Sequence, residues 1–149
     1  MLKLTRKTLL AIEAVVDIAY NARPDPVQAR DVTERQGIPQ RYLEQVMQAL
    51  VRAGVLKGVR GPRGGYTLAR ERRRVTVGDV VRVVSTLDAE EGEAGPASAL
   101  GISVVSPLWE EMQRDLLDRL DGITMEDLCR EAQRQDVPRA DETRPDFTI

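Results

Sequence analysis

The sequence contains no histidine and one cysteine, Cys129, among its 149 residues. A single cysteine excludes a disulfide within the chain and any metal site built from several thiolates of one chain. The absence of histidine removes the most common zinc ligand and the usual general base of enzymes. Since the sequence also contains no paired catalytic motif, we expect neither an enzyme nor a bound cofactor.

Aromatic residues are scarce as well, at 3% of the chain, so leucine, valine, isoleucine and alanine must fill the core. No apolar run approaches the roughly 20 residues of a membrane span, and the amino-terminal residues lack the apolar region of a signal peptide. We therefore expect a cytoplasmic protein that has no membrane partner. Its length suits one domain, or a small domain with an extension.

The formal net charge of −2 conceals two halves of opposite charge. Residues 1–80 hold 15 Lys/Arg and 8 Asp/Glu, a net of +7, whereas residues 81–149 hold 7 and 16, a net of −9. Because the distribution of charge steers association more than the total does, we expect only the first half to meet an anionic partner.

Three amphipathic patterns at residues 5–21, 28–36 and 39–53 predict three helices. Only a short turn containing Gly37 separates the second from the third. This arrangement is typical of a helix-turn-helix, whose second helix normally lies in the major groove of DNA.

The third predicted helix carries a polar face with groups able to read bases. Arginine can donate to guanine, glutamine can pair with adenine, and glutamate can accept from the amino group of cytosine. The same side chains would also suit an ordinary helix face exposed to water. The hairpin that follows the helix favours the interpretation as base contacts. The residues of this face are Gln40, Arg41, Glu44, Gln45 and Gln48.

Residues 60–66 read Arg-Gly-Pro-Arg-Gly-Gly-Tyr and lie between two β-forming runs, 55–59 and 66–69. The pattern predicts a hairpin whose glycines permit positive φ and close approach of the backbone to a ligand, and whose Pro62 stiffens the turn. These glycines are Gly61, Gly64 and Gly65. A helix-turn-helix followed by such a hairpin is the order of a winged helix-turn-helix.

Basic side chains at and near the hairpin are candidates to contact DNA. Arg60 and Arg63 could enter a minor groove or bind phosphates, and the alternative is an ordinary solvated hairpin. Lys57 and the basic run 70–74 are further candidates for phosphate contacts, although charge runs are often only solvated faces.

The remaining sequence predicts two more helical regions. Thr76 and Asp79 have the spacing of a helix start, for a helix that ends near residue 86, and residues 88–103 have the composition of a flexible connector. A long apolar stripe from residue 105 to 123 then requires a partner surface. Thr124 begins a last short helix, and the polar chain from residue 134 onward suggests disorder. The fold class we expect is mainly α with a small β-hairpin wing.

Several motifs give the chain a specific resemblance. They are the amino-terminal Leu-Thr-Arg-Lys, the segments Arg35-Gln-Gly-Ile-Pro-Gln-Arg-Tyr-Leu-Glu-Gln and Ala53-Gly-Val-Leu, the hairpin 60–66, and Leu108-Trp109 with Ile123-Thr124 and Leu128. Over about residues 1–132 the chain resembles the IscR-type regulators, the Rrf-two family of winged-helix transcription factors.

The resemblance implies a homodimer that binds double-stranded promoter DNA at a pseudo-palindromic operator, and we expect a repressor. By motif position, Gln40, Arg41, Tyr42, Glu44 and Gln45 match the recognition helix, and residues 60–65 match the wing. The long helix would join the two copies through Leu108, Trp109, Met112, Leu116 and Leu120. This organisation divides the chain into a DNA-binding domain at 1–86, a connector at 87–104, dimerisation helices at 105–133 and a tail at 134–149.

The chain departs from this family at the connector, where many relatives carry three closely spaced cysteines that hold an iron–sulfur cluster. Residues 88–105 contain none, so we expect no cluster. The connector acids Asp88, Glu90, Glu91 and Glu93 could bind a hard cation or merely add solubility. Cys129 lies on an apolar helix face, which favours a buried, inert thiol over a redox sensor. Trp109 and Met112 could line a ligand pocket instead of a dimer core.

A second function remains open at this stage. The winged-helix scaffold could be a protein-interaction module that docks a metabolic enzyme without binding DNA, although the basic head weighs against it. The residues do not identify the regulated genes, nor an effector or partner protein that would control the release of DNA.

Overall fold

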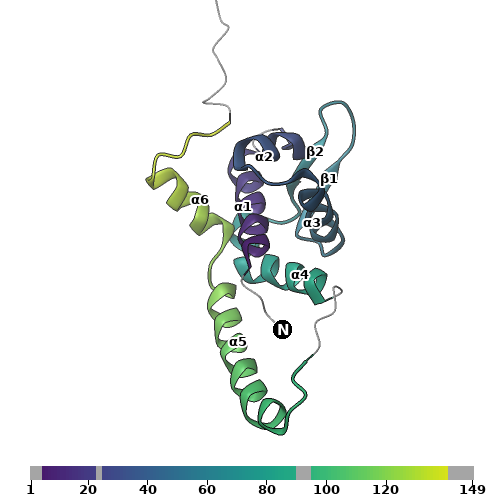
Figure 1. Ribbon diagram of the computed structural model, residues 1–149. Helices are drawn as coiled ribbons and strands as arrows, with labels where there is room; N and C mark the ends of the chain where they lie inside the picture. Colours follow the sequence, from purple (N-terminus) through teal and green to yellow (C-terminus); the bar gives the residue numbers. More distant parts are fainter. Residues whose placement is uncertain (1–4, 23–24, 90–94, 141–149) are drawn as a thin grey trace, which may run out of the picture.

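The structure is a computed structural model that describes residues 5–22, 25–89 and 95–140. These residues form a mainly helical fold with one two-stranded antiparallel hairpin, which confirms the predicted fold class (Figure 1). The elements are α1 (Arg6–Asn21), α2 (Ala29–Gln36), α3 (Gln40–Arg52), β1 (Leu56–Val59), β2 (Gly65–Leu68), the short η1 (Arg72–Arg74), α4 (Val77–Ala89), the π-type turn η2 (Gly101–Val105), α5 (Ser106–Asp121) and α6 (Met125–Arg134).

The core lies around α1, against which α2, α3, α4 and α6 all pack. Aliphatic side chains and alanine fill it, as the scarcity of aromatic residues requires. Representative members with at most 2% exposure are Ile18 of α1, Leu43 and Leu50 of α3, Val80 of α4 and Cys129 of α6. The burial of Cys129 is therefore confirmed, whereas its lack of reactivity stays a prediction.

A buried carboxylate fixes α2 against α1. The Asp17 side chain is fully buried, and it accepts hydrogen bonds from Nε and Nη2 of Arg35, each at 2.8 Å, and from Nε2 of Gln36 at 2.9 Å. The hydrogen bond to Asp17 is the main reason why the pKa of Arg35 is raised above its ordinary value. Because α2 leads directly into α3, this contact helps to orient the whole helix-turn-helix.

The chain after α6 lies against the end of α1, although the sequence predicts no ordered structure from residue 134. The Tyr20 hydroxyl donates to the Val137 carbonyl at 2.6 Å, and Asn21 Oδ1 accepts from the Ala140 amide at 2.8 Å. The Arg139 guanidinium lies 5.2 Å from the centre of the Tyr20 ring. These partners are more than 100 residues away in the sequence, so the local pattern cannot reveal them. The remainder of the predicted tail, residues 141–149, lies outside the described residues.

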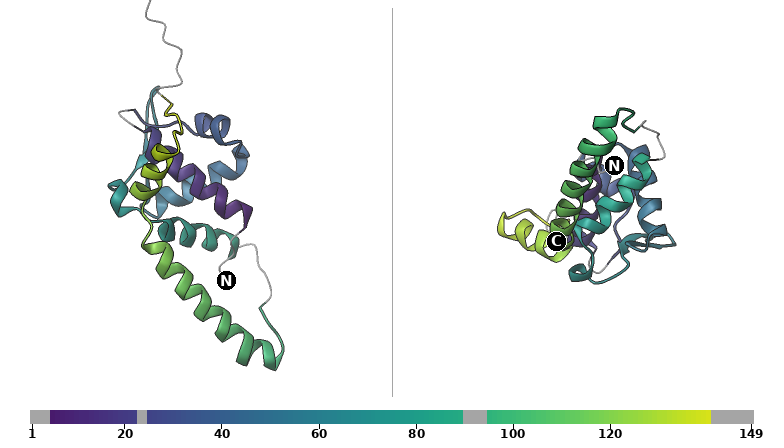
Figure 2. Two further views of the ribbon diagram at one scale, coloured as in Figure 1. Left: turned by 90° about the vertical axis from the view of Figure 1, so that its left-hand side faces the viewer. Right: turned by 90° about the horizontal axis from the view of Figure 1, so that it is seen from below.

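The region predicted as a flexible connector is partly helical. Helix α4 continues to Ala89, and η2 leads without interruption into α5. Residues 90–94 lie outside the described part. Helices α1–α4 and α6 and the hairpin form the head of the molecule. Helix α5 extends away from this head (Figure 2). Among the described helices, none is long and apolar enough to cross a membrane.

Candidate nucleic-acid interface

Helix α3 presents the predicted polar face to solvent. Its opposite face is anchored in the core by Leu43, Val46, Met47 and Leu50. All five residues of the polar face predicted from the sequence are exposed, namely Gln40, Arg41, Glu44, Gln45 and Gln48. The fold thus presents a row of hydrogen-bonding side chains that no core contact requires.

Two of these side chains bind each other. Nε2 of Gln40 donates to Oε1 of Glu44 at 3.2 Å, one helical turn away on the exposed surface. This hydrogen bond occupies one donor of Gln40 and one oxygen of Glu44. Arg41 and Gln45 form no such bond with any residue that the structure describes, so they are the groups most available for bases.

Tyr42 differs from the other predicted recognition residues because its hydroxyl contacts the protein itself. It donates to the backbone carbonyl of Lys7 at 2.5 Å, and the Lys7 ammonium lies 5.8 Å from the ring centre. The residue therefore holds the first turn of α1 beside α3. This contact gives Tyr42 a structural role that the motif match alone does not indicate, and it adds Lys7 to the cations near α3.

The wing is a tight antiparallel hairpin supported by a third segment. Strands β1 and β2 pair with Gly58 opposite Tyr66, and Tyr66 also exchanges backbone hydrogen bonds of 2.7 and 2.9 Å with Val27. Residue 27 precedes α2, so the wing is attached directly to the start of the helix-turn-helix. The strand thereby sets the position of the wing relative to α3.

The three wing glycines serve different purposes. Only Gly61 has positive φ, at 111°. A Cβ at Gly64 would overlap the Val59 carbonyl oxygen, and one at Gly65 would lie 2.5 Å from the Val27 carbonyl oxygen. Gly64 and Gly65 are thus required by close backbone packing inside the protein, in addition to any approach to DNA that the sequence suggests.

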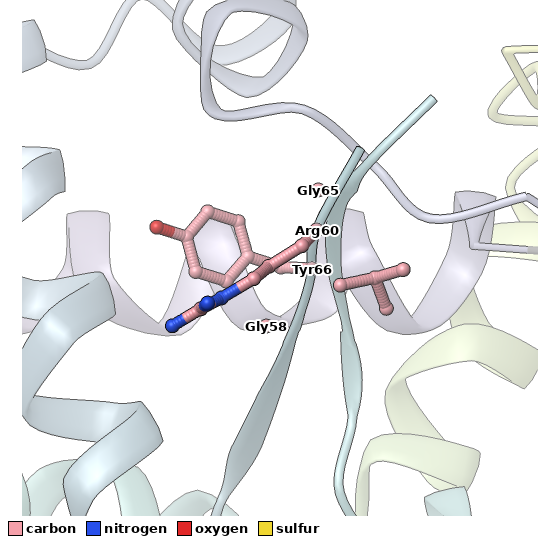
Figure 3. A pocket seen from close by; sticks show the side chains of 5 residues that line it. Gly58, Arg60, Gly65 and Tyr66 are labelled. Carbon is pink, nitrogen blue, oxygen red and sulfur yellow. The ribbon is translucent and has the colours of Figure 1, made fainter. Parts of the chain in front are cut away.

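The hairpin carries exposed cations. Lys57, Arg60 and Arg63 are all exposed, and none forms an ion pair within the described residues. Figure 3 shows the Arg60 and Tyr66 side chains extending from the same side of the hairpin, close to each other. Gly58 faces Tyr66 across the strands and contributes no side chain over the tyrosine ring, which is partly buried against the core.

An open groove connects the wing to α3, and we call it the α3–wing groove. One hollow of about 330 Å³ lies along the hairpin, and a second of about 390 Å³ lies between the hairpin and the end of α3. Gly58 and Tyr66 line both hollows. The other lining residues are Val59, Arg60 and Gly65 in the first, and Gln48, Val51 and Arg52 in the second. Arg52 and Tyr66 were not predicted as site residues, because the sequence shows the helix and the hairpin as separate patterns. The one sequence signal for Arg52 is its spacing: Glu44, Gln48 and Arg52 repeat every four residues and so share a helix face.

The basic run at 70–74 is mostly engaged in ion pairs. Arg70 pairs with Asp79, Arg72 with Glu126 and Arg73 with Glu71, at 3.3, 3.0 and 2.7 Å. Two of these pairs join the segment after the wing to α4 and α6. The run therefore acts mainly within the fold, and the cations of α3 and the wing are better candidates for contacts with DNA phosphates.

The predicted dimerisation residues fall into two groups. Leu108, Trp109 and Met112 are 55%, 48% and 49% exposed, whereas Leu116 and Leu120 are half-buried against the core of their own chain. The exposed stripe includes Val105 and continues into the segment predicted as connector, through Leu100, Ile102 and Val104. A run of large apolar side chains this exposed is typical of a protein interface.

The comparisons with known proteins agree on one family. A family profile described as "Rrf2: Iron-dependent Transcriptional regulator" matches residues 4–131. The iron in that description does not fit the donors of this chain. Its only thiol, Cys129, is 2% exposed in the core, the sequence has no histidine, and the described residues bring together no three potential metal ligands. An iron–sulfur cluster held by several thiolates cannot be built from this set.

Individual relatives match over nearly the whole chain. The HTH-type transcriptional regulator IscR of Vibrio campbellii is 33% identical over 93% of this chain and 88% of its own length. A putative HTH-type transcriptional regulator of Azotobacter vinelandii is 34% identical over 96% and 88%. These relatives are transcriptional regulators and not enzymes.

Solved structures lead to the same conclusion. The structure of T. potens IscR matches with a TM-score of 0.71 at 34% identity, and covers 93% of this chain and 94% of its own. CymR, described as the global cysteine regulator of B. subtilis, matches with a TM-score of 0.67 at 28% identity over 88% and 98%. The chain therefore belongs to the Rrf2 family of winged helix-turn-helix transcriptional regulators.

Proposed function

We propose that the protein is a homodimeric, sequence-specific regulator that binds a pseudo-palindromic promoter operator and represses transcription without an iron–sulfur cluster. One observation carries the proposal: Gln48 and Arg52 of α3 line one hollow, Arg60 of the wing lines a second, and the two hollows share Gly58 and Tyr66. Because promoter DNA is the partner, we expect the protein to act in the cytoplasm.

The groove suggests a path for the DNA. Arg41 and Gln45 would contact base edges in the major groove, and Arg60 and Arg63 would enter the adjacent minor groove. The sugar–phosphate backbone between these two grooves would then run along the α3–wing groove. There Arg52 can neutralise a phosphate, and the exposed part of the Tyr66 ring can pack against a deoxyribose.

A second copy of the chain is the partner we propose for the exposed stripe of α5. Leu108, Trp109 and Met112 are exposed in the first half of α5. Helix α5 itself extends from the rest of the fold (Figure 1). Since these three side chains are about half exposed, burial of each against a second copy would stabilise the dimer by about 0.7–1.5 kcal/mol. Neither the acidic connector nor the proposed lack of a cluster identifies the effector that would control the release of DNA.

An electrophoretic mobility shift assay tests the DNA path, with an operator selected from genomic fragments. We expect Arg60→Ala and Arg63→Ala to weaken binding to all sequences and to lower the salt slope by about 1 each. Arg41→Ala should weaken mainly the correct operator, by about 1–3 kcal/mol. Arg73→Ala is the matched control, because it removes an exposed arginine that pairs with Glu71 outside the groove.

Wild-type affinity in both wing variants would show that the wing does not contact DNA. If no genomic fragment is retained by the wild-type protein, the interaction-module function is favoured instead. Sedimentation tests the dimer separately: a Leu108→Glu, Met112→Glu double variant should be monomeric. Arg114→Ala, on the polar face of α5, should remain dimeric.

A further inference from the structure

The connection between α5 and its own head determines where the second head of the proposed dimer lies. A dimer that recognises two half-sites must hold its heads at a separation that matches the helical repeat of DNA. In the proposed dimer the α5 helices make the contact between copies. The angle between α5 and the head therefore controls the separation of the two α3 helices. This inference rests on the proposed function, since it requires a dimer that binds two half-sites.

The first attachment of α5 to the head is a short backbone bridge. The Val77 amide donates to the Ile123 carbonyl and the Met125 amide donates to the Val75 carbonyl, both at 2.8 Å. Thr76 and Thr124 form the isolated bridge between these bonds, and each caps the helix that follows it. A bridge of two hydrogen bonds fixes the position of this junction, and the direction of α5 depends on contacts outside the bridge, among them the packing of Leu116 and Leu120 on the core.

The second attachment is a bidentate ion pair. Arg82 of α4 donates through Nη1 and Nη2 to Oδ1 and Oδ2 of Asp121, at 2.5 and 2.7 Å. Asp121 is the last residue of α5. The Asp121 carboxylate lies against Gly78, two residues beyond Thr76 in α4, so the pair holds the same end of α5 as the bridge does. Together with the packing of Leu116 and Leu120 on the core, it restricts the direction of α5 as well as its position.

Gly78 makes room for the pair. A Cβ at this position would overlap Oδ1 of Asp121 and lie 3.1 Å from Nη1 of Arg82. Glycine is unfavourable inside a helix, so its presence in the first turn of α4 has a physical explanation in this contact. The hydrogen bond between the two side chains lowers the pKa of Asp121 and raises that of Arg82. Both groups therefore stay charged at neutral pH.

A small tilt at this junction has a large effect at the other end of α5. Its 16 residues span roughly 24 Å, so a tilt of about 10° moves the far end by about 4 Å. That displacement is close to the rise of one base pair, roughly 3.4 Å. The exposed apolar stripe lies at this far end, away from the head (Figure 2).

We propose that the Arg82–Asp121 pair, seated on Gly78, is a positioning device that determines which spacing between operator half-sites the dimer accepts. An isolated pair this exposed changes an equilibrium by up to about fivefold, and each dimer contains two pairs. Because the two contributions multiply, loss of both pairs should reduce the preference for the correct spacing by about twofold to 25-fold. It should not remove base recognition, because no residue of α3 or the wing is altered.

The test measures binding of the full chain to a series of operators that differ by one or two base pairs between half-sites. We expect Arg82→Ala to reduce the preference for the native spacing, and Gly78→Ala to do the same with both charges intact. The charge-swapped double variant Arg82→Asp, Asp121→Arg should restore it. Arg134→Ala is the matched control, since its partner Glu131 lies on the same helix and joins no second element.

The outcomes separate this inference from the proposed function. If the wild type is a dimer that binds its operator, and both Arg82→Ala and Gly78→Ala keep its spacing preference, the positioning role is refuted alone. If the wild type is monomeric or binds no operator, the proposed function fails and the positioning role fails with it.

Discussion

Substitution of Gly65 by alanine is a direct test of how the wing is attached to the head. The new Cβ would lie 2.5 Å from the Val27 carbonyl oxygen and 2.7 Å from its carbonyl carbon. Both distances are far below ordinary van der Waals contact, and the obstacle is backbone, so β2 or the Val27 segment must move. Gly58→Ala is the matched control, because a Cβ at this other strand glycine meets no atom within 4 Å.

The expected magnitude follows from the contacts. Movement of β2 breaks the two hydrogen bonds between Val27 and Tyr66, each worth about 1 kcal/mol. Replacing a strand glycine by alanine by itself stabilises the folded state by about 0.5–1 kcal/mol, because alanine loses less backbone entropy on folding. We therefore expect Gly65→Ala to lower the free energy of unfolding by about 1–1.5 kcal/mol. Gly58→Ala should instead leave it unchanged or raise it slightly.

Urea unfolding followed by circular dichroism measures both variants against wild type. The difference between them should be about 2 kcal/mol, which for a domain of this size corresponds to roughly 4–8 °C in Tm. Gly65→Ala should also bind operator more weakly, because the wing no longer sits at its fixed distance from α3. Equal midpoints for Gly65→Ala and Gly58→Ala would refute the close packing of β2 on the Val27 segment.

Three further predictions concern stability. Arg35→Ala should lower the free energy of unfolding by about 3 kcal/mol in urea titrations, because it leaves the buried Asp17 carboxylate without its cation; a loss below 0.5 kcal/mol, on the order of a neutral surface substitution, would contradict this. Tyr20→Phe removes the donor to the Val137 carbonyl and should lower it by about 1 kcal/mol, and an unchanged Tm would mean that this contact contributes nothing. The pKa of Asp127 is lowered, chiefly by the hydrogen bond from the backbone amide of Thr124. The contribution of Asp127 to folding stability is therefore present above the ordinary carboxyl pKa and is lost as the pH falls through the lowered value. The stability difference between wild type and Asp127→Asn should hold from pH 5 to 8 and shrink below about pH 4, and a difference that shrinks near pH 6 would contradict the assignment.

Much of the fold follows from local patterns in the sequence. The apolar spacing at residues 5–21 and 39–53 predicts α1 and α3 to within a residue or two, and both Thr-x-x-Asp motifs begin helices as predicted. Each of these patterns involves residues only a few positions apart. They can therefore be recognised without knowing which distant parts of the chain are in contact.

The candidate site could be predicted only in part. The exposed polar face of α3 and the cationic hairpin are readable from sequence, because each requires only periodicity or turn chemistry. The α3–wing groove depends on how Val27 holds Tyr66, so the contribution of Arg52 is invisible until the chain is folded. The predicted role of Tyr42 at the DNA remains a prediction beside its observed contact with Lys7.

Composition and short-range spacing suffice to indicate a mainly helical winged helix with a basic head and to exclude a metal site that needs several thiolates. Which arginines serve the fold and which remain available to a partner depends on tertiary packing, because distant carboxylates have to come into contact with them. The structure also reveals the ordered segment 135–140 and the Arg82–Asp121 pair. Both depend on contacts between residues at least 39 positions apart, and no local pattern of residues encodes which distant groups the packed core brings together.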